Sequence, residues 1–415
     1  MEVISAPEFI RRVCSSRQPT WVQIGETVKR IIAAVKEKGD AAVLQFEAEF
    51  GFAPKWLRVP ADEIKGAASR VPAELRKALR IAAERIREYH ESLPVPRSCD
   101  VKVGEGRIRF TVEPLEKVGV YVPGGRASYP STMLMTAIPA RVAGVKEIVV
   151  CTPPGPDGIP AAATLAAAVE CGVDSIFCCG GAQAIAAMAY GTETIPKVNK
   201  IVGPGNAFVT AAKKEVYGVV DIDGLAGPSE LMVAIGNVGD RVLGWALEDL
   251  RAQAEHDPQA VCVAVTTSHA IAEKLSELSG DVNGYIVFCE TGWTQGLEVI
   301  EHFAPEHLEL LGEDAKHLAG KVRSAGAVLV GPFSPVAAGD YMAGPSHVLP
   351  TGGSARSFSG LWTGSFLRSH SVMELTRQEL GQLLGVGETL AVAEGLRAHA
   401  RSFTVRRDSS RGDGL

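Results

Sequence analysis

Apolar positions in the first 95 residues recur at helical spacing. Residues 24–50 predict a helical stretch with a break at Gly39-Asp40, and residues 74–93 predict a second amphipathic helix, because apolar side chains return every three or four positions. Pro94 and Pro96 end this region. Residues 101–115 then predict a β-hairpin with glycine at its turn.

From Val118 onward, short apolar segments alternate with Ala-rich helical ones. The predicted strands end in Gly or Pro, as in "VGVYVPGG" and "DSIFCCGG", and such strands are typical of a parallel sheet covered on both faces. The alternation resumes with the strand "LMVAIG" and a helix over 240–256. We therefore predict an α/β fold with two Rossmann-like parallel-sheet domains, a helical N-terminal region and a C-terminal helical extension.

The chain of 415 residues is too long for one ordinary core. We expect a helical N-terminal region with the hairpin (1–112), a first Rossmann-like domain (113–232), a second (233–360), a C-terminal helical dimerisation segment (361–405) and a disordered polar tail (406–415).

Composition and charge exclude several classes of protein. Hydrophobic residues make up 46% and charged residues 22%, which indicates a globular cytoplasmic protein. The net charge is −6 with scattered Lys and Arg, so a nucleic-acid partner is not expected. No signal peptide is visible at the start, and Glu170 and Asp174 interrupt the low-charge stretch 161–191, which argues against a membrane span. Eight cysteines without a C-x-x-C pair are interpreted as mostly buried thiols.

The segment "LRAQAEHDPQA" ends a predicted helix with Gln253 and His256 on one face, because positions three apart are neighbours on a helix. Together with Asp340 and His399 they could supply two imidazoles, an amide oxygen and a carboxylate. Such a set suits Zn²⁺, with Mn²⁺ or Co²⁺ as substitutes. A lone helical histidine is more often structural, so the metal site stays open at this point.

Glu306 precedes His307 directly, and an imidazole near its ordinary pKa can accept protons at neutral pH. An exposed pair without a role is the alternative. We interpret five further histidines as solvated: His90, His269, His302, His317 and His370. The turn "GPGNAF" lacks the third glycine of the dinucleotide fingerprint, although the carboxyl edge of a parallel sheet is still the natural place for a ligand.

Seven segments, read in order over roughly residues 115–400, resemble the histidinol dehydrogenase family. They are "YVPGGRASYPSTMLMTAIPARVAG", "GGAQAIAAMAYGTETIPKVNKIVGPGNAFVTAAK", "AGPSE", "AQAEHDP", "APEHLEL", "GDYMAGPSHVLPT" and "EGLRAHARSF". The resemblance implies a zinc-dependent alcohol and aldehyde dehydrogenase of histidine biosynthesis. Such an enzyme oxidises L-histidinol to L-histidinaldehyde and then to L-histidine, using two NAD⁺ per turnover and one Zn²⁺ per active site.

The resemblance also implies roles for individual residues. Glu306 and His307 match the catalytic pair, with His307 as the base and Glu306 activating water for the second oxidation. The implied zinc ligands, which also surround the substrate, are Gln253, His256, Asp340 and His399. Further substrate contacts would be Ser229, His347 and Glu394, and NAD contacts Tyr121, Gln183 and Asn206. The family forms an intertwined homodimer, in which the partner subunit would supply His399 and Glu394.

Two alternatives stay open in the sequence. A relative with the same fold could oxidise another small alcohol, such as a sulfonated diol, although Glu394 together with His399 favours histidinol. A catalytically inactive small-molecule binder is the second, and the presence of both Glu306 and His307 argues against it. Residues 354–372 depart from the family's usual pattern, which puts the details of substrate preference in doubt.

Overall fold

The computed structural model describes residues 1–16, 23–104, 106–124, 128–173, 175–255, 258–280 and 282–408. The chain divides into two compact units. The first contains Met1–Leu93 and Leu115–Phe366, and the second contains Pro94–Pro114 and the chain from Leu367 onward. The first unit holds two parallel sheets, so the predicted α/β class with two parallel-sheet domains is confirmed.

The five-stranded sheet of the first unit has the order β6-β5-β4-β7-β8, and its paired strands are parallel. Its strands are β4 (Lys117–Tyr121), β5 (Glu147–Thr152), β6 (Ser175–Cys178), β7 (Lys200–Val202) and β8 (Asp221–Ile222). Ile148 and Val150 pack into one core, while Val149 and Cys151 pack into another. Successive strand residues point to opposite faces, so both faces of this sheet are apolar and covered.

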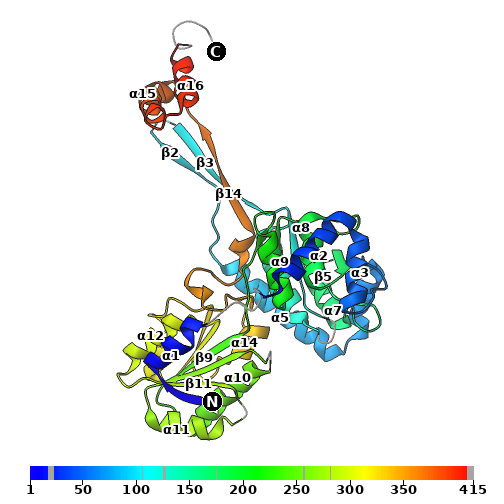
Figure 1. Ribbon diagram of the computed structural model, residues 1–415, viewed down its shortest axis with the longest axis vertical. Helices are drawn as coiled ribbons and strands as arrows, with labels where there is room; N and C mark the ends of the chain where they lie inside the picture. The colour runs from blue at the N-terminus through cyan, green and yellow to red at the C-terminus, as the bar shows by residue number, and fades with distance from the viewer. Residues whose placement is uncertain are drawn as a thin grey trace. The chain divides into compact units, whose positions relative to one another are not determined.

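Helices cover the two faces in two groups (Figure 1). One group contributes to the core around Val150, and it consists of α4 (Ala61–Ala67), α5 (Ala73–Ser92), α6 (Pro130–Ala143) and α7 (Ala162–Glu170). The other contributes to the core around Val149, and it consists of α2 (Gly25–Lys38), α3 (Asp40–Phe50), α8 (Gly181–Tyr190) and α9 (Ala207–Val216). The predicted break at Gly39-Asp40 is the boundary between α2 and α3.

The six-stranded sheet has the order β1-β11-β10-β9-β12-β13, again with parallel pairs. Its strands are β1 (Glu2–Ser5), β9 (Glu230–Ile235), β10 (Val261–Thr266), β11 (Gly284–Phe288), β12 (His307–Leu311) and β13 (Ala327–Val330). Helices α1 (Ala6–Arg12) and α12 (Trp293–Phe303) cover one face, and α10 (Asp240–Ala254) and α11 (His269–Leu278) cover the other (Figure 1). Two short helices follow β12 and β13, namely α13 (Glu313–Lys316) and α14 (Val336–Tyr341).

The second unit is a three-stranded antiparallel sheet followed by two helices (Figure 1). The strand order is β14-β3-β2, with β2 (Cys99–Val103), β3 (Gly106–Pro114) and β14 (Leu367–Glu374). The predicted hairpin is present as β2 and β3. Helix α15 (Arg377–Ala393) packs on α16 (Arg397–Asp408), where Phe403 lies against Gly387.

The structure differs from the expected division at several boundaries. Residues 2–5, expected in a helical region, form β1 and pair with β11, because four residues are too few for a visible alternation. The boundary at 232/233 falls inside β9. The segment 361–405 contains the strand β14 as well as helix, and α16 continues to Asp408 within the expected tail. Short 3₁₀ turns lie at Cys14–Ser16, Ala68–Arg70, Ser354–Arg356 and Thr363–Phe366.

Candidate active site

Four of the predicted residues come from segments at the amino edge of the six-stranded sheet, where its strands begin. Ser229 directly precedes β9, and Glu306 directly precedes β12, whose first residue is His307. The parallel register aligns His307 with Leu231, near the start of β9. Gln253 reaches the same edge because α10 runs back along the sheet and ends just before β10 begins. Ligands of α/β sheets more often lie at the carboxyl edge, so this gathering is unusual.

Glu306 and His307 are nearly enclosed, with 7% and 5% of their surfaces exposed. Glu306 Oε2 lies 3.8 Å from His307 Nδ1 and accepts a 2.9 Å hydrogen bond from the Glu230 backbone N–H. Burial raises the pKa of the Glu306 carboxyl well above its usual range, and the nearby carboxylates of Glu230 and Asp340 raise it further. The pair is therefore not the exposed one that the sequence left possible.

Asp340 lies on the other side of the His307 ring. Its Oδ1 is 3.5 Å from His307 Nε2, and α14 carries it to this position. Its backbone carbonyl oxygen accepts a 2.8 Å hydrogen bond from His347 Nδ1, while His347 Nε2 lies 3.4 Å from Thr132 Oγ1. The ring of His307 thus has a carboxyl group near each nitrogen.

Gln253 has a buried amide at the end of an apolar helix face. The buried positions of α10 are Leu243, Ala246, Leu247, Leu250 and Gln253. Gln253 is 1% exposed, and within the described part of the chain its Nε2 has no hydrogen-bond partner. A buried amide without a partner is costly, so this side chain fits a position that is completed by a bound group.

The structure does not place the two remaining predicted histidine ligands, His256 and His399, beside Gln253. His256 lies outside the described residues. His399 and Glu394 are exposed and belong to the second unit, on α16 and at the C-terminal end of α15. Across the described ranges, no three His, Cys, Asp or Glu side chains converge as a metal site. The four-ligand set therefore stays a prediction.

The three predicted NAD contacts lie at the carboxyl edge of the five-stranded sheet, where its strands end. Tyr121 ends β4, and its hydroxyl accepts a 3.1 Å hydrogen bond from Gly181 N–H at the start of α8. Gln183, in the first turn of α8, donates from Nε2 to Glu47 Oε1 at 2.7 Å. Asn206 caps α9, since its Oδ1 accepts from the N–H groups of Phe208 and Val209 at 3.0 and 3.2 Å.

A buried ion pair, missed in the sequence, fixes the turn beside these residues. Lys213 Nζ lies 2.6 Å from Asp223 Oδ1, and Asp223 Oδ2 accepts a 2.6 Å hydrogen bond from Gly203 N–H. Gly203 has a φ of +116°, and a Cβ there would lie 2.1 Å from the Tyr121 carbonyl oxygen. Only glycine fits this approach of the turn to β4. Lys213 is the last residue of one of the segments that resemble the family, and this position was the only sequence feature that pointed to it.

One of the five histidines interpreted as solvated is buried. His269, His302, His317 and His370 are exposed, whereas His90 is enclosed, with its Nδ1 at 3.2 Å from Thr363 Oγ1. Burial lowers the pKa of His90 to about 4. The interpretation of His90 was wrong because it continues the buried positions Leu79, Ala83 and Ile86 of α5 at helical spacing.

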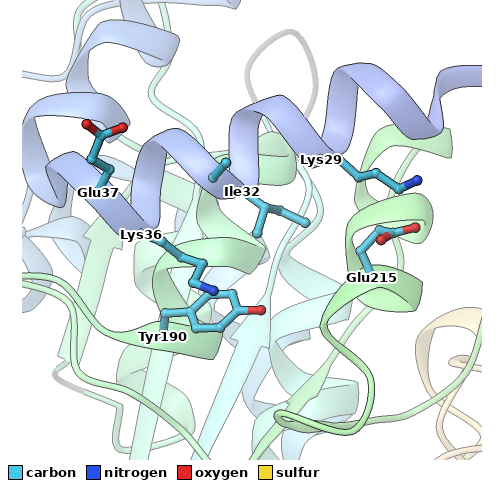
Figure 2. Close-up of a pocket in the computed structure, with 7 residues that line it drawn as sticks. Lys29, Ile32, Lys36, Glu37, Tyr190 and Glu215 are labelled. Carbon is cyan, nitrogen blue, oxygen red and sulfur yellow. The ribbon is translucent and has the colours of Figure 1, made fainter.

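A surface hollow of about 440 Å³ lies elsewhere, along α2. Its lining residues are Lys29, Ile32, Ala33, Lys36, Glu37, Tyr190 and Glu215 (Figure 2). Lys36 Nζ lies 4.6 Å from the centre of the Tyr190 ring, and Lys29 Nζ is 3.0 Å from Glu26 Oε1. None of the predicted site residues is among the residues that line this hollow.

Two further expectations concern the cysteines and membrane spans. Cys151, Cys171, Cys178, Cys179, Cys262 and Cys289 are buried free thiols, whereas Cys99 is exposed and Cys14 is half-buried. Among the helices of the described residues, none has the length and apolarity needed to cross a bilayer.

Comparisons with known proteins agree on one family. The family model described as histidinol dehydrogenase matches residues 15–407. A histidinol dehydrogenase of Synechococcus sp. is 43% identical over 424 residues, with 96% of each chain covered, and one of Methanosarcina mazei is 42% identical over 419 residues, covering 97% of this chain and 96% of the relative. The crystal structure of histidinol dehydrogenase from Elizabethkingia anophelis is similar with a TM-score of 0.89 and 32% identity, covering 99% of each chain.

Proposed function

The chain belongs to the histidinol dehydrogenase family, and we propose that it oxidises L-histidinol to L-histidinaldehyde and then to L-histidine. Members of this family are oxidoreductases of histidine biosynthesis. The observation that carries the proposal is the enclosed Glu306–His307 pair at the amino edge of the six-stranded sheet, with Asp340 beside the ring and the unpartnered Gln253 amide at the same edge.

His307 is proposed as the base of both oxidations. Removal of the alcohol proton makes the carbinol carbon a better hydride donor, and NAD⁺ is proposed as the hydride acceptor, two molecules being used per turnover. Asp340 Oδ1 lies 3.5 Å from Nε2, where it can pair with the imidazolium that results. A positioned base of this kind contributes about 10²–10⁴-fold to a rate.

Glu306 is proposed to activate the water that the aldehyde needs before the second oxidation. A carboxyl whose pKa is raised by burial is a stronger base than a solvated carboxylate once it is ionised. Ionisation of Glu306 is favoured when His307 is protonated, because the two groups lie 3.8 Å apart. The two residues therefore suit successive roles, with His307 first and Glu306 second.

Zinc is proposed at the same edge, held by Gln253, His256, Asp340 and His399. The donor set contains nitrogen and oxygen but no thiolate, which fits a zinc ion with room for substrate groups. Gln253 would bind the ion through its amide oxygen, while its buried Nε2, which has no partner among the described residues, would be left to donate a hydrogen bond. When bound, zinc would supply a cationic anchor for the imidazole and amino groups of histidinol. Ser229, His347 and Glu394 are proposed to surround the substrate, with Glu394 facing its ammonium group.

NAD⁺ is proposed at the carboxyl edge of the five-stranded sheet, near Tyr121, Gln183 and Asn206. The N-termini of α8 and α9 both follow strand ends at this edge, and the positive end of a helix dipole favours phosphate groups. A site of this kind does not need the usual glycine fingerprint. Six of the eight thiols are buried and free, and we infer a cytoplasmic location.

A homodimer that completes each site with Glu394 and His399 of the other subunit is also proposed. In the second unit, apolar side chains on one strand and one helix are exposed, including Val372, Met373, Val386, Leu390 and Val392. Exposed apolar patches of this kind mark protein interfaces. We expect light scattering to give twice the mass of the chain.

Mixed dimers test the shared site. His307→Asn and His399→Ala subunits, each inactive alone, should recover about a quarter of the wild-type activity when mixed, because half of the dimers would contain one intact site. Two inactive proteins that stay inactive after verified subunit exchange would contradict a site built across the dimer.

The central experiment is a turnover assay on the purified protein with metal analysis, before and after chelation. We expect histidinol-dependent NADH formation, about one zinc per subunit, and loss of activity on chelation that zinc restores. Dihydroxypropanesulfonate serves as the competing substrate. A tenfold or greater preference for the sulfonate, by the ratio of kcat/KM, would replace histidinol by the other small alcohol.

A further inference from the structure

Another buried carboxyl group lies next to the proposed site and has no part in the proposed reaction. Glu309 is on β12, two residues beyond His307, and is 1% exposed. Its register partner on β9 is Val233, which belongs to the core under α10, so Glu309 points to the same side of the sheet. Within the described residues its Oε2 has no hydrogen-bond partner.

The other oxygen of Glu309 makes one short contact. Oε1 accepts a 2.6 Å hydrogen bond from the backbone N–H of Val336, the first residue of α14. The first N–H groups of a helix have no partner within the helix, so this contact satisfies one of them. Asp340 lies one turn further along α14, with its Oδ1 at 3.5 Å from His307 Nε2. Glu309 thus links the strand that carries His307 to the helix that carries Asp340.

We propose that Glu309 is a positioning residue: by accepting the Val336 N–H, its carboxyl group holds α14 in the place that sets Asp340 beside His307. A helix of six residues has little stability of its own. Its start must therefore be held by the surrounding fold. The consequence for catalysis rests on the proposed function, whereas the positioning of α14 does not.

Charge is not what the contact requires. Burial, together with the nearby Asp249 on α10, raises the pKa of Glu309 to about 8, so the group is largely neutral at pH 7. A neutral acid and an amide both offer a carbonyl oxygen to the Val336 N–H. Glu309→Gln should therefore preserve the contact. Glu309→Met keeps a similar length but removes the oxygen, and Glu309→Asp keeps the acid but shortens its reach.

Hydrogen exchange of the full-length protein tests the positioning. In Glu309→Met and Glu309→Asp we expect the amides of Val336–Tyr341 to exchange at least about tenfold faster, and in Glu309→Gln within about twofold of wild type. Thr266→Val is the matched control, since Thr266 is buried in the same sheet and its hydroxyl accepts a 3.2 Å hydrogen bond from Ser268 N–H beside α11. That variant should leave α14 unchanged.

Unchanged amide exchange of α14 in a folded Glu309→Met protein would overturn the proposal. So would a Glu309→Gln protein in which the amides of α14 exchange as fast as they do in Glu309→Met. If Glu309→Met does not fold, the comparison of Asp with Gln decides by the same criterion. In the histidinol assay, kcat should fall by about 10–100-fold in Glu309→Met, with an unchanged KM for NAD⁺ and rescue by Gln. Absence of histidinol oxidation in wild type would reject the proposed function but leave the exchange result intact.

Discussion

The two candidate regions of the first unit are built in opposite ways. At the carboxyl edge of the five-stranded sheet, the candidate side chains are paired within the protein. The Tyr121 hydroxyl accepts from Gly181, Gln183 donates to Glu47, and Asn206 caps α9. At the amino edge of the six-stranded sheet, Gln253 Nε2 has no hydrogen-bond partner among the described residues, and neither has Glu309 Oε2, two residues further along β12. Burial there also raises the pKa of Glu306.

This difference is the one expected between a structural scaffold and a candidate reactive site. Hydrogen bonds at the carboxyl edge stabilise the strand-to-helix turns whether or not a ligand is bound. A cofactor would therefore bind to a largely preformed surface. The amino edge is electrostatically unfavourable, because burying several carboxyl groups close together costs free energy unless a bound cation or a hydrogen-bond donor compensates. Substitutions at the first edge should therefore change stability and cofactor affinity. Substitutions at the second should change the rate of chemistry.

The largest effect is expected for His307→Asn. Loss of the base should lower kcat for both oxidations by at least about 10³-fold, while NAD⁺ binding stays within about twofold of wild type. His302→Asn, an exposed histidine on α12, is the control and should retain activity. Stopped-flow NADH formation and calorimetric titration with NAD⁺ provide the two measurements. Near-normal turnover would remove His307 from the role of base.

Lys213→Met should have the next largest effect, and it acts on stability. It leaves Asp223 buried without its cation, which costs roughly 3–5 kcal/mol of unfolding free energy. Lys214→Met, next to it but exposed, should change the free energy little. In the double variant Lys213→Met/Asp223→Leu we expect most of the loss to be recovered. Urea denaturation gives these values. Equal losses of unfolding free energy in the Lys213 and Lys214 variants would contradict a stabilising role of the buried ion pair at the carboxyl edge.

The elements of both regions were predictable, because their apolar periods are long and uninterrupted. Strand residues buried on both faces, such as Val149 and Val150, give continuous apolar runs, and the break at Gly39-Asp40 is local. The four residues of β1 show no such run. Their place at the sheet edge depends on pairing with β11, more than 270 positions away, which no local pattern encodes.

The chemistry of the residues at the amino edge was enough to propose them as candidates. Their position at that edge of the sheet could not be predicted from the sequence. The general rule pointed to carboxyl edges, whereas Ser229 and Glu306 directly precede their strands and His307 is the first residue of β12. Contacts such as Glu309 with Val336 join positions that differ by 27 residues and depend on the sheet register. His90 is a different case. The helical spacing of the buried positions of α5 predicts that His90 is buried, but its polar side chain led to the opposite interpretation.

Glu306→Gln tests whether the amino edge holds two separate functions. We expect histidinaldehyde oxidation to fall about 10²-fold and histidinol oxidation less than about fivefold, because only the second step needs an activated water. Glu298→Gln, an exposed carboxyl on α12, should change neither. The half-reactions are measured separately with each substrate supplied. Equal losses would mean that Glu306 acts on His307 and not on water.

Asn206 gives the smallest effect and the sharpest test of the carboxyl edge, because it can serve as a helix cap and as a cofactor contact. Asn206→Ala removes the acceptor for Phe208 and Val209 and should cost about 1 kcal/mol of stability, whereas Asn206→Ser keeps a capping oxygen. If the amide also contacts NAD⁺, both variants should raise the KM for NAD⁺ about fivefold without changing that for histidinol. A serine variant that restores both stability and KM would make Asn206 a cap alone. The carboxyl edge would then be purely structural at this position, and the cofactor would have to be held elsewhere along it.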